Sequence, residues 1–148
     1  MFRGTTWYLQ KVMNELWRTT DSGQTYLIED VEPAIEHIIR SNTETYQDIL
    51  YQLTTRQKEL LLAIGREGQV QQITRSAFIK RYRLSSASSV QKAAETLVRQ
   101  HIITQDKGVF EIYDKFFALW LATMERWLMF ISFFEVCQHH FAPYIYKM

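Results

Sequence analysis

The sequence predicts a mainly α-helical chain built around a winged helix-turn-helix, that is, three helices plus a β-hairpin wing. Three observations support this fold class. Apolar residues recur at helical spacing in two stretches between residues 54 and 82. The stretch 85–99 has the most regular pattern and opens with serines that can cap a helix. A strand-turn-strand pattern with a glycine in its turn follows at residues 102–113.

We expect three segments: a helical region at residues 1–53, the winged helix at residues 54–115, and an aromatic-rich helical extension at residues 116–148. A chain of 148 residues with 47% hydrophobic residues can bury a core and is globular rather than disordered.

The first segment contains three amphipathic helical patterns. The first covers residues 6–19, the second residues 28–40 and the third begins after Asn42. Pro33 falls in the first turn of the second helix, where its missing amide hydrogen costs little. The expected apolar faces are Leu9, Val12, Met13, Leu16 and Trp17; Val31, Ala34, Ile35, Ile38 and Ile39; and Tyr46, Ile49, Leu50 and Leu53.

The winged helix is expected to begin with a capping box, in which Thr54 is the N-cap and Gln57 the third helical residue. The helix that follows should end at Gly65 or Gly68, and residues 69–71 should form a short strand. We expect Thr74 to cap the next helix. The side chains expected to point inward from that helix are Phe78, Ile79 and Tyr82.

Residues 83–85 are expected to form the turn into the central helix, residues 85–99. Its buried face should consist of Val90, Ala93, Ala94, Leu97 and Val98. Strands at residues 102–105 and 109–113, joined by a turn at 106–108, should complete the hairpin.

Asp114 can cap a last helix that covers residues 116–138 and is apolar on nearly all sides. Such a helix is normally buried, so this extension is expected to meet another domain or a second copy of the chain, as in a homodimer. Binding at a membrane surface is a weaker alternative because the extension lacks a Lys/Arg face.

Charge is unevenly distributed although the formal net charge is only +1. Residues 54–114 contain ten Lys/Arg and six Asp/Glu, so the positive charge lies on the expected winged helix. The one cysteine, Cys137, excludes an intramolecular disulfide, and no signal peptide is evident. The longest apolar run, residues 127–134, is shorter than the roughly 20 residues that span a bilayer. We therefore expect a cytoplasmic protein.

In a helix-turn-helix the second helix enters the major groove with its N-terminal residues at base edges. In this chain the exposed residues at the N-terminal end of that helix would be Ser86, Ser88, Ser89, Gln91 and Lys92. Arg99 and Lys107 would lie near phosphates, and the preceding helix and turn add Arg75, Lys80, Arg81 and Arg83. The alternative is a structural or protein-contacting winged helix, which Glu95 favours because its carboxylate would face phosphate.

Other chemistry finds little support in the sequence. Cys137, His139 and His140 lack the second ligand pair of a usual zinc site. Glu29, Asp30 and Glu32 are interpreted as charge favoured at a helix N-terminus rather than as acid/base catalysts. Hydrolase, metalloprotease and phosphate-loop motifs are absent, so we predict no catalytic, cofactor or metal site in this chain.

Several motifs together resemble the C-terminal lid and winged helix of prokaryotic AAA+-type P-loop ATPases, of the archaeal-ATPase-like or STAND-like kind. The resemblance covers about residues 5–121 and depends on these runs: Thr6-Trp7-Tyr8-Leu9-Gln10, Leu16-Trp17, Leu53-Thr54-Thr55-Arg56-Gln57, Leu60-Leu61-x-Ala63-Ile64, Tyr82-x-Leu84-x-Ser86-Ala87-Ser88-Ser89-Val90-Gln91, and Asp114-x-Phe116-Phe117-Ala118-Leu119-Trp120-Leu121. The resemblance does not extend beyond Ala122.

The resemblance implies a lid-like role for residues 1–53 and a non-catalytic regulatory or interaction role for the chain. The phosphate loop and the acidic Mg²⁺-binding strand of that family precede the lid, and the chain contains neither. ATP and Mg²⁺ are therefore implied only for an upstream ATPase core, and Arg3, Thr5 and Thr6 would lie nearest the nucleotide. The expected partners are that core or another protein, with double-stranded DNA as a further one. The alternative is a stand-alone winged-helix DNA-binding protein, such as a dimeric transcription regulator.

Overall fold

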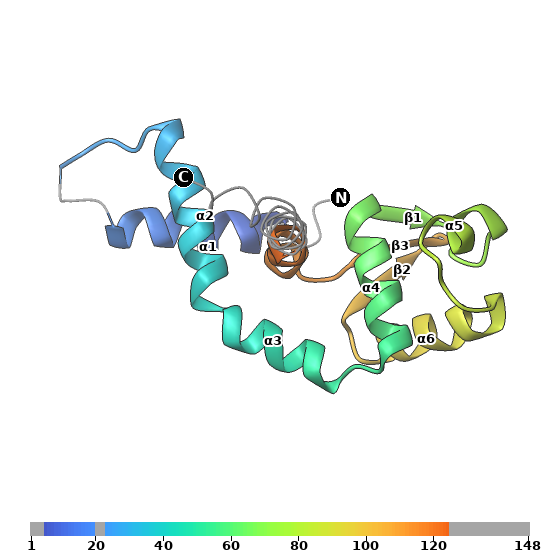
Figure 1. Ribbon diagram of the computed structural model, residues 1–148. Helices are drawn as coiled ribbons and strands as arrows, with labels where there is room; N and C mark the ends of the chain where they lie inside the picture. Colours follow the sequence, from blue (N-terminus) through green and yellow to red (C-terminus); the bar gives the residue numbers. More distant parts are fainter. Residues whose placement is uncertain (1–4, 20–22, 125–148) are drawn as a thin grey trace, which may run out of the picture.

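The structure is a computed structural model that describes residues 5–19 and 23–124. A helical region at one end and a winged helix at the other are joined by a last helix, residues 115–124, that lies between them (Figure 1). The elements are α1 (Thr5–Thr19), the 3-10 helix η1 (Ile28–Asp30), α2 (Val31–Ser41), α3 (Thr43–Gln52), α4 (Thr55–Glu67), β1 (Gln69–Gln71), α5 (Ser76–Arg81), α6 (Ala87–Arg99), β2 (Ile103–Asp106) and β3 (Val109–Ile112).

The predicted fold class is confirmed. Helices α4, α5 and α6 and three short strands follow one another in the order α4-β1-α5-α6-β2-β3. The strands form one antiparallel sheet in the order β1-β3-β2, so β3 lies in the middle although it comes last in the chain. Val70 pairs with Phe110 on one side of β3, and Ile103 pairs with Ile112 on the other. This sheet with its hairpin is the wing of a winged helix.

The predicted capping box at the start of α4 is confirmed. The Thr54 hydroxyl accepts a hydrogen bond from the Gln57 amide at 3.4 Å, and the Gln57 side-chain oxygen accepts one from the Thr54 amide at 2.8 Å. Helix α4 continues through Gly65 and ends before Gly68, whose φ of 75° is the left-handed conformation that favours glycine. A Cβ atom at Gly65 would lie 3.4 Å from the Ile112 side chain, so this glycine lets β3 approach α4 closely.

Two predicted helix starts are wrong by one or two residues. The N-cap of α5 is Arg75 rather than Thr74, and its side chain makes no capping hydrogen bond. The N-cap of α6 is Ser86, whose hydroxyl accepts from the Ser89 amide at 3.4 Å, so Ser85 belongs to the preceding turn. Both positions are flanked by further Ser or Thr residues, and the sequence pattern does not distinguish between adjacent candidate caps.

The predicted hairpin is confirmed, but its turn is shorter than expected. Asp106 belongs to β2 and pairs with Val109, so only Lys107 and Gly108 remain in the turn. Their φ angles of 47° and 80° match a type I′ turn, which follows the twist of the two strands. Ile102 and Tyr113 lie just outside the strands, although the Tyr113 amide donates to the Ile102 carbonyl at 3.0 Å.

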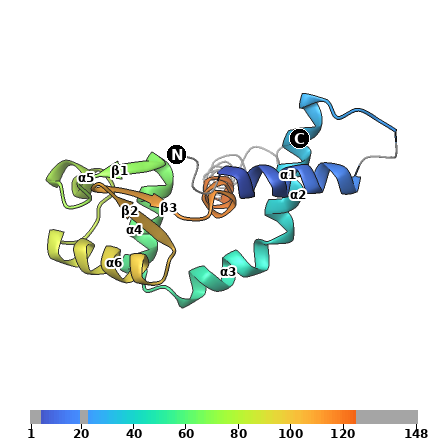
Figure 2. The ribbon, with the colours of Figure 1, turned by 180° about the vertical axis from the view of Figure 1, so that it is seen from behind.

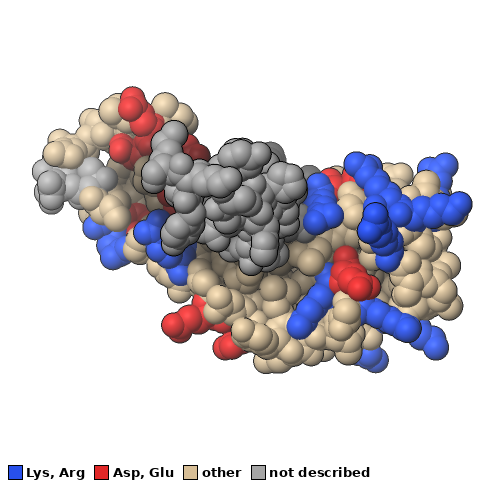
Figure 3. All heavy atoms as spheres, viewed as in Figure 1, with Lys and Arg blue, Asp and Glu red and all other residues tan. Residues whose placement is uncertain are grey.

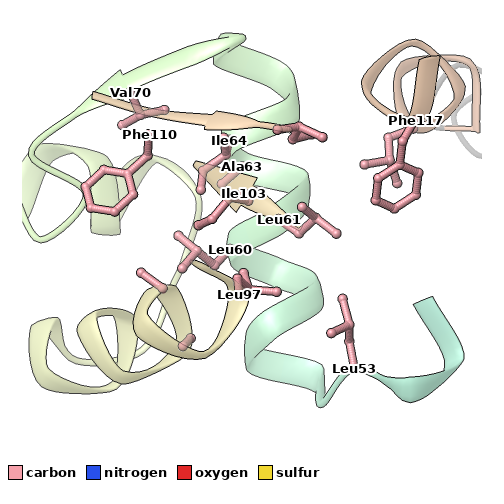
Figure 4. Close-up of a cluster of buried hydrophobic side chains, with 14 of the residues drawn as sticks. Leu53, Leu60, Leu61, Ala63, Ile64, Val70, Leu97, Ile103, Phe110 and Phe117 are labelled. Atoms are coloured by element: carbon pink, nitrogen blue, oxygen red, sulfur yellow. The ribbon is translucent and has the colours of Figure 1, made fainter. Parts of the chain in front are cut away.

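The core of the winged helix lies between α4, α6 and the sheet (Figure 4). Leu61, Ile64 and Leu97 have no exposed surface, and Ile103 and Phe110 close the core from the sheet. The face predicted for α6 is confirmed, with Val98 partly buried at its edge. The core continues into Tyr46 of α3, whose ring lies 5.0 Å from that of Phe117 and 5.6 Å from that of Trp120.

The apolar face predicted for α1 is wrong at three of its five positions. Leu16 is buried, whereas Leu9, Met13 and Trp17 are 60%, 46% and 78% exposed. By contrast, Ala34 and Ile38 of α2 are buried as expected, and Pro33 lies in the first turn of that helix. The face of α1 that packs on the rest of the chain therefore carries Leu16 together with the partly buried Tyr8 and Val12, at i, i+4 and i+8.

Tyr8, which the apolar pattern did not select, attaches α1 to the winged helix. Its hydroxyl donates to the Tyr113 carbonyl at 3.0 Å and accepts from the Lys115 amide at 3.1 Å. Its ring meets that of Phe116 edge-on at 5.3 Å. Asp114 caps the helix 115–124 as predicted, because its carboxylate accepts from the Phe116 amide at 2.8 Å. Figure 2 shows this helix from behind, between α1 and the sheet.

Candidate nucleic-acid interface

The three parts that would meet nucleic acid are the N-terminal half of α6, the helix α5 before it, and the β2–β3 turn. These parts lie in the half of the molecule that is remote from α1 (Figure 1). Gln71 at the end of β1 pairs with Val109, so the β2–β3 turn lies beside the end of β1 that leads to α5. All nine residues predicted to contact DNA have exposed side chains, namely Arg75, Lys80, Arg81, Arg83, Ser88, Gln91, Lys92, Arg99 and Lys107.

The outer face of α6 is less free to read bases than the sequence suggested. The Gln91 side-chain amide donates to the Glu95 carboxylate at 3.1 Å, so the longest polar side chain near the N-terminus already has a partner. The Ser86 and Ser88 hydroxyls lie 3.1 Å apart, and Arg99 donates to Thr96 at 3.4 Å. The Lys92 ammonium forms neither an ion pair nor a hydrogen bond with the described residues, so its charge on the outer face of α6 is uncompensated.

Arg56 joins this surface although the sequence analysis did not select it. Its guanidinium donates to the Ser89 hydroxyl at 2.6 Å, which places a positive charge from the first turn of α4 beside the first turn of α6. The two residues are 33 positions apart, so no local pattern could bring them together. The packing of α4 against α6 in the shared hydrophobic core sets the distance between Arg56 and Ser89.

Some of the positive charge on α5 is already compensated. The Arg81 guanidinium lies 2.9 Å from the Glu67 carboxylate, and the Tyr82 hydroxyl donates to the same carboxylate at 2.6 Å. The guanidinium groups of Arg66 and Arg81 also lie over the Tyr82 ring. Burial, followed by the hydrogen bond to Glu67, raises the pKa of the Tyr82 phenol, so it stays a neutral donor at physiological pH. Arg81 is thus a weaker candidate for phosphate contact than Arg75 or Lys80.

The charges of the two halves of the molecule differ in sign. The described part of the helical region, residues 5–19 and 23–53, contains three Lys/Arg and seven Asp/Glu, against ten and six at residues 54–114. Figure 3 shows Lys and Arg side chains spread over the winged helix, while most of the acidic side chains in view lie over or near the N-terminal helices. Glu29, Asp30 and Glu32 lie at the N-terminal end of α2, as predicted.

Other kinds of site find no support in the described part of the chain. Within residues 5–19 and 23–124, no group of three or more His, Cys, Asp or Glu side chains is placed to hold a metal ion. The cluster of Cys137, His139 and His140 lies outside the described residues, as does the predicted dimer surface beyond residue 124. No helix in the described ranges is both long and apolar enough to span a membrane.

Comparison with known proteins gives one match. A family model described as a probable winged helix domain matches residues 44–123, which begin in α3 and include most of the helix 115–124. Neither the curated proteins nor the solved structures gave a match. The match starts ten residues before the predicted boundary at residue 54, in agreement with the core contacts of Tyr46.

Proposed function

The chain belongs to the family described as a probable winged helix domain. We propose that it is a non-catalytic binding module whose winged helix contacts double-stranded DNA. The separation of charge carries the proposal, because the surplus of Lys and Arg lies on the half of the molecule that contains α5, α6 and the wing. Neutralising phosphates releases counterions and supplies most non-specific affinity for DNA. A winged helix domain is typically a binding module rather than an enzyme.

The contacts on α6 favour binding to the phosphate backbone over reading of bases. The amide of Gln91 is occupied by Glu95, and the serines around it are short. The Glu95 carboxylate also opposes close approach of the helix to phosphates. We therefore expect weak preference for DNA sequence and strong dependence on salt.

The test is fluorescence anisotropy of a labelled random duplex titrated with the full chain at several salt concentrations. Each phosphate contact contributes about −0.9 to the slope of log K against log salt. Lys92→Ala and Lys107→Ala should each reduce that slope by about one. Arg40→Ala, which removes an exposed charge from α2, is the matched control and should leave the slope unchanged. Absence of binding at low salt, or an equal loss in the Arg40 variant, would contradict the proposal.

A second candidate function, favoured by a separate observation, is the interaction region of an AAA+-type P-loop ATPase. Leu9, Met13 and Trp17 follow one another at i, i+4 and i+8 on α1 and remain largely exposed. A row of large apolar side chains at this spacing suits a partner protein. In the resembled family the lid follows the nucleotide-binding core, so α1 would pack on that core, and ATP and Mg²⁺ would belong to the core alone.

This second function is tested by mixing the chain with a P-loop ATPase core from the same genome, produced as a separate polypeptide, and following co-elution by light scattering. Met13→Glu with Trp17→Glu should abolish co-elution, while Asn14→Glu, at an exposed position of α1 outside the row, should not. Persistence of the complex in the double variant would exclude the α1 surface.

The same measurement on the chain alone tests the predicted homodimer through residues 116–148. The DNA and core surfaces lie at opposite ends of the molecule, so the two functions are compatible (Figure 1).

A further inference from the structure

A cavity of about 380 Å³ lies where α3, the α6–β2 connection and the start of the helix 115–124 meet. This volume is within the range of small-molecule sites in proteins. The cavity is separate from the surface formed by α5, the N-terminal half of α6 and the wing, because it adjoins the other end of α6. Its floor is apolar and consists of Ile49, Leu53, Ile102 and Phe117.

The rim of the cavity is polar and has a definite sign of charge. It carries three exposed residues, Gln52, Gln100 and His101, and the half-buried Asp114. No Lys or Arg is found among the described residues that line the cavity. The electrostatic preference is therefore for a cation, placed next to an apolar floor that includes an aromatic ring.

Asp114 retains capacity to accept a further hydrogen bond. One of its oxygens accepts from the Phe116 amide at 2.8 Å and the Phe117 amide at 3.4 Å. Among the described residues, the other accepts only from the Tyr46 hydroxyl, at 3.3 Å. An ionised carboxylate offers about four acceptor positions. These contacts also fix the orientation of the carboxylate of this cavity-lining residue.

His101 occupies a backbone position that is normally given to glycine. Its φ is 57°, and it ends α6 in a Schellman motif, in which the Ile102 amide donates to the Leu97 carbonyl and the His101 amide donates to the Val98 carbonyl, both at 3.0 Å. A histidine in this conformation costs stability relative to glycine. Its exposed imidazole makes no hydrogen bond with the described residues, so no contact of this side chain explains why the position holds histidine instead of glycine. Strain of this kind at a cavity rim is associated with ligand sites.

We propose that this cavity binds a small amphipathic cation, with an aromatic or branched apolar body over Phe117 and an ammonium group beside Asp114. His101 and the two glutamines border the bound molecule at the rim. Because the lining comes from α3, the α6–β2 connection and the helix 115–124, the ligand holds these three segments together.

The experiment is a titration of the ¹⁵N-labelled full chain with phenethylamine, followed by amide chemical shifts. A ligand with so few heavy atoms should bind with a dissociation constant on the order of 1 mM. The shifts should saturate and be confined to residues 49–53, 100–102 and 114–117. Phenylacetate has the same ring and the opposite charge, and it should bind at least about tenfold more weakly.

Two variants separate binding from folding. Asp114→Asn keeps an oxygen that can cap the last helix and should weaken phenethylamine about tenfold. His101→Gly should raise the thermal unfolding midpoint and still weaken binding severalfold, a combination that a purely structural role would not give. Asp48→Asn, an exposed carboxylate on α3 that does not line the cavity, is the matched control and should change the affinity less than twofold.

Three results would overturn the proposal. These are equal binding of phenylacetate and phenethylamine, shifts that scatter over the surface without saturation, and unchanged affinity in the His101→Gly protein. The last variant is expected to fold at least as well as the original chain, so its result stands even where Asp114→Asn lowers stability.

Discussion

Helices α1 and α6 have similar amphipathic patterns and very different surroundings. In α6 the apolar row of Val90, Ala93, Ala94 and Leu97 is buried against α4 and the sheet. In α1 the corresponding row leaves Trp17 78% exposed and buries only Leu16. The periodicity predicts the helix in both cases, but it predicts the buried face correctly only in α6. Burial depends on whether another element of the described chain lies opposite that face.

The same contrast holds for polar groups. The first helix of the winged helix, α4, begins with a reciprocal capping box, whereas α2 and α3 begin without a side-chain capping hydrogen bond. The two regions meet through Tyr8 and through the rings of Tyr46, Phe117 and Trp120. We infer that the winged helix carries most of the stability and that α1 is held by a few contacts.

The largest expected effect compares the two helices directly. Leu97→Ala removes a side chain with no exposed surface and should lower the free energy of unfolding by about 3 kcal/mol. Trp17→Ala, although it removes more atoms, should change it by less than about 0.5 kcal/mol. Urea unfolding followed by circular dichroism measures both. A large loss in the Trp17 variant would show that the exposed row of α1 is covered in solution.

The second effect concerns the capping box of α4. Thr54→Ala removes the acceptor for the Gln57 amide and should cost about 1 kcal/mol. Arg75→Ala is the control, since this N-cap residue of α5 makes no capping hydrogen bond, and it should be neutral within about 0.5 kcal/mol. The same urea series gives both values, and equal costs would contradict the assignment of the caps.

The third effect tests the junction between the two regions. Tyr8→Phe keeps the ring contact with Phe116 and removes both hydrogen bonds of the hydroxyl, to Tyr113 and Lys115. The expected cost is about 1 kcal/mol or less because the group is partly solvated. Hydrogen exchange should show faster opening of α1 with little change in α6. Uniform acceleration across both helices would mean that the two regions unfold as one unit.

The smallest effect appears only in alkali. Burial, followed by the nearby Asp114 carboxylate, raises the pKa of the Tyr46 phenol, and burial also raises the pKa of Tyr8. Below about pH 10 both the native and the unfolded chain keep these protons. Above it the unfolded chain loses them first, so the free energy of unfolding falls as pH rises. In Tyr46→Phe this fall should be shallower in urea titrations between pH 9 and 11, and an unchanged slope would contradict the assignment.

Local sequence patterns were enough to predict the helices, the hairpin, the capping box at Thr54 and the positive charge of the winged helix. These features depend on residues close together in the chain, through the 3.6-residue period, the turn preference of glycine and the side chains of the caps. The nine predicted contact residues were all found on the surface, since polar and charged side chains are seldom fully buried. That they contact DNA stays a prediction.

Which of these local features have neighbours depended on the tertiary structure. It brought Arg56 to Ser89, compensated Arg81 with Glu67, and left the row of Leu9, Met13 and Trp17 on α1 uncovered. It also assembled the cavity from segments between residues 49 and 117. Arg56 and Ser89, Glu67 and Arg81, and the cavity segments are far apart in the chain, and their proximity depends on how the helices and the sheet pack together. No periodicity along the sequence carries that information.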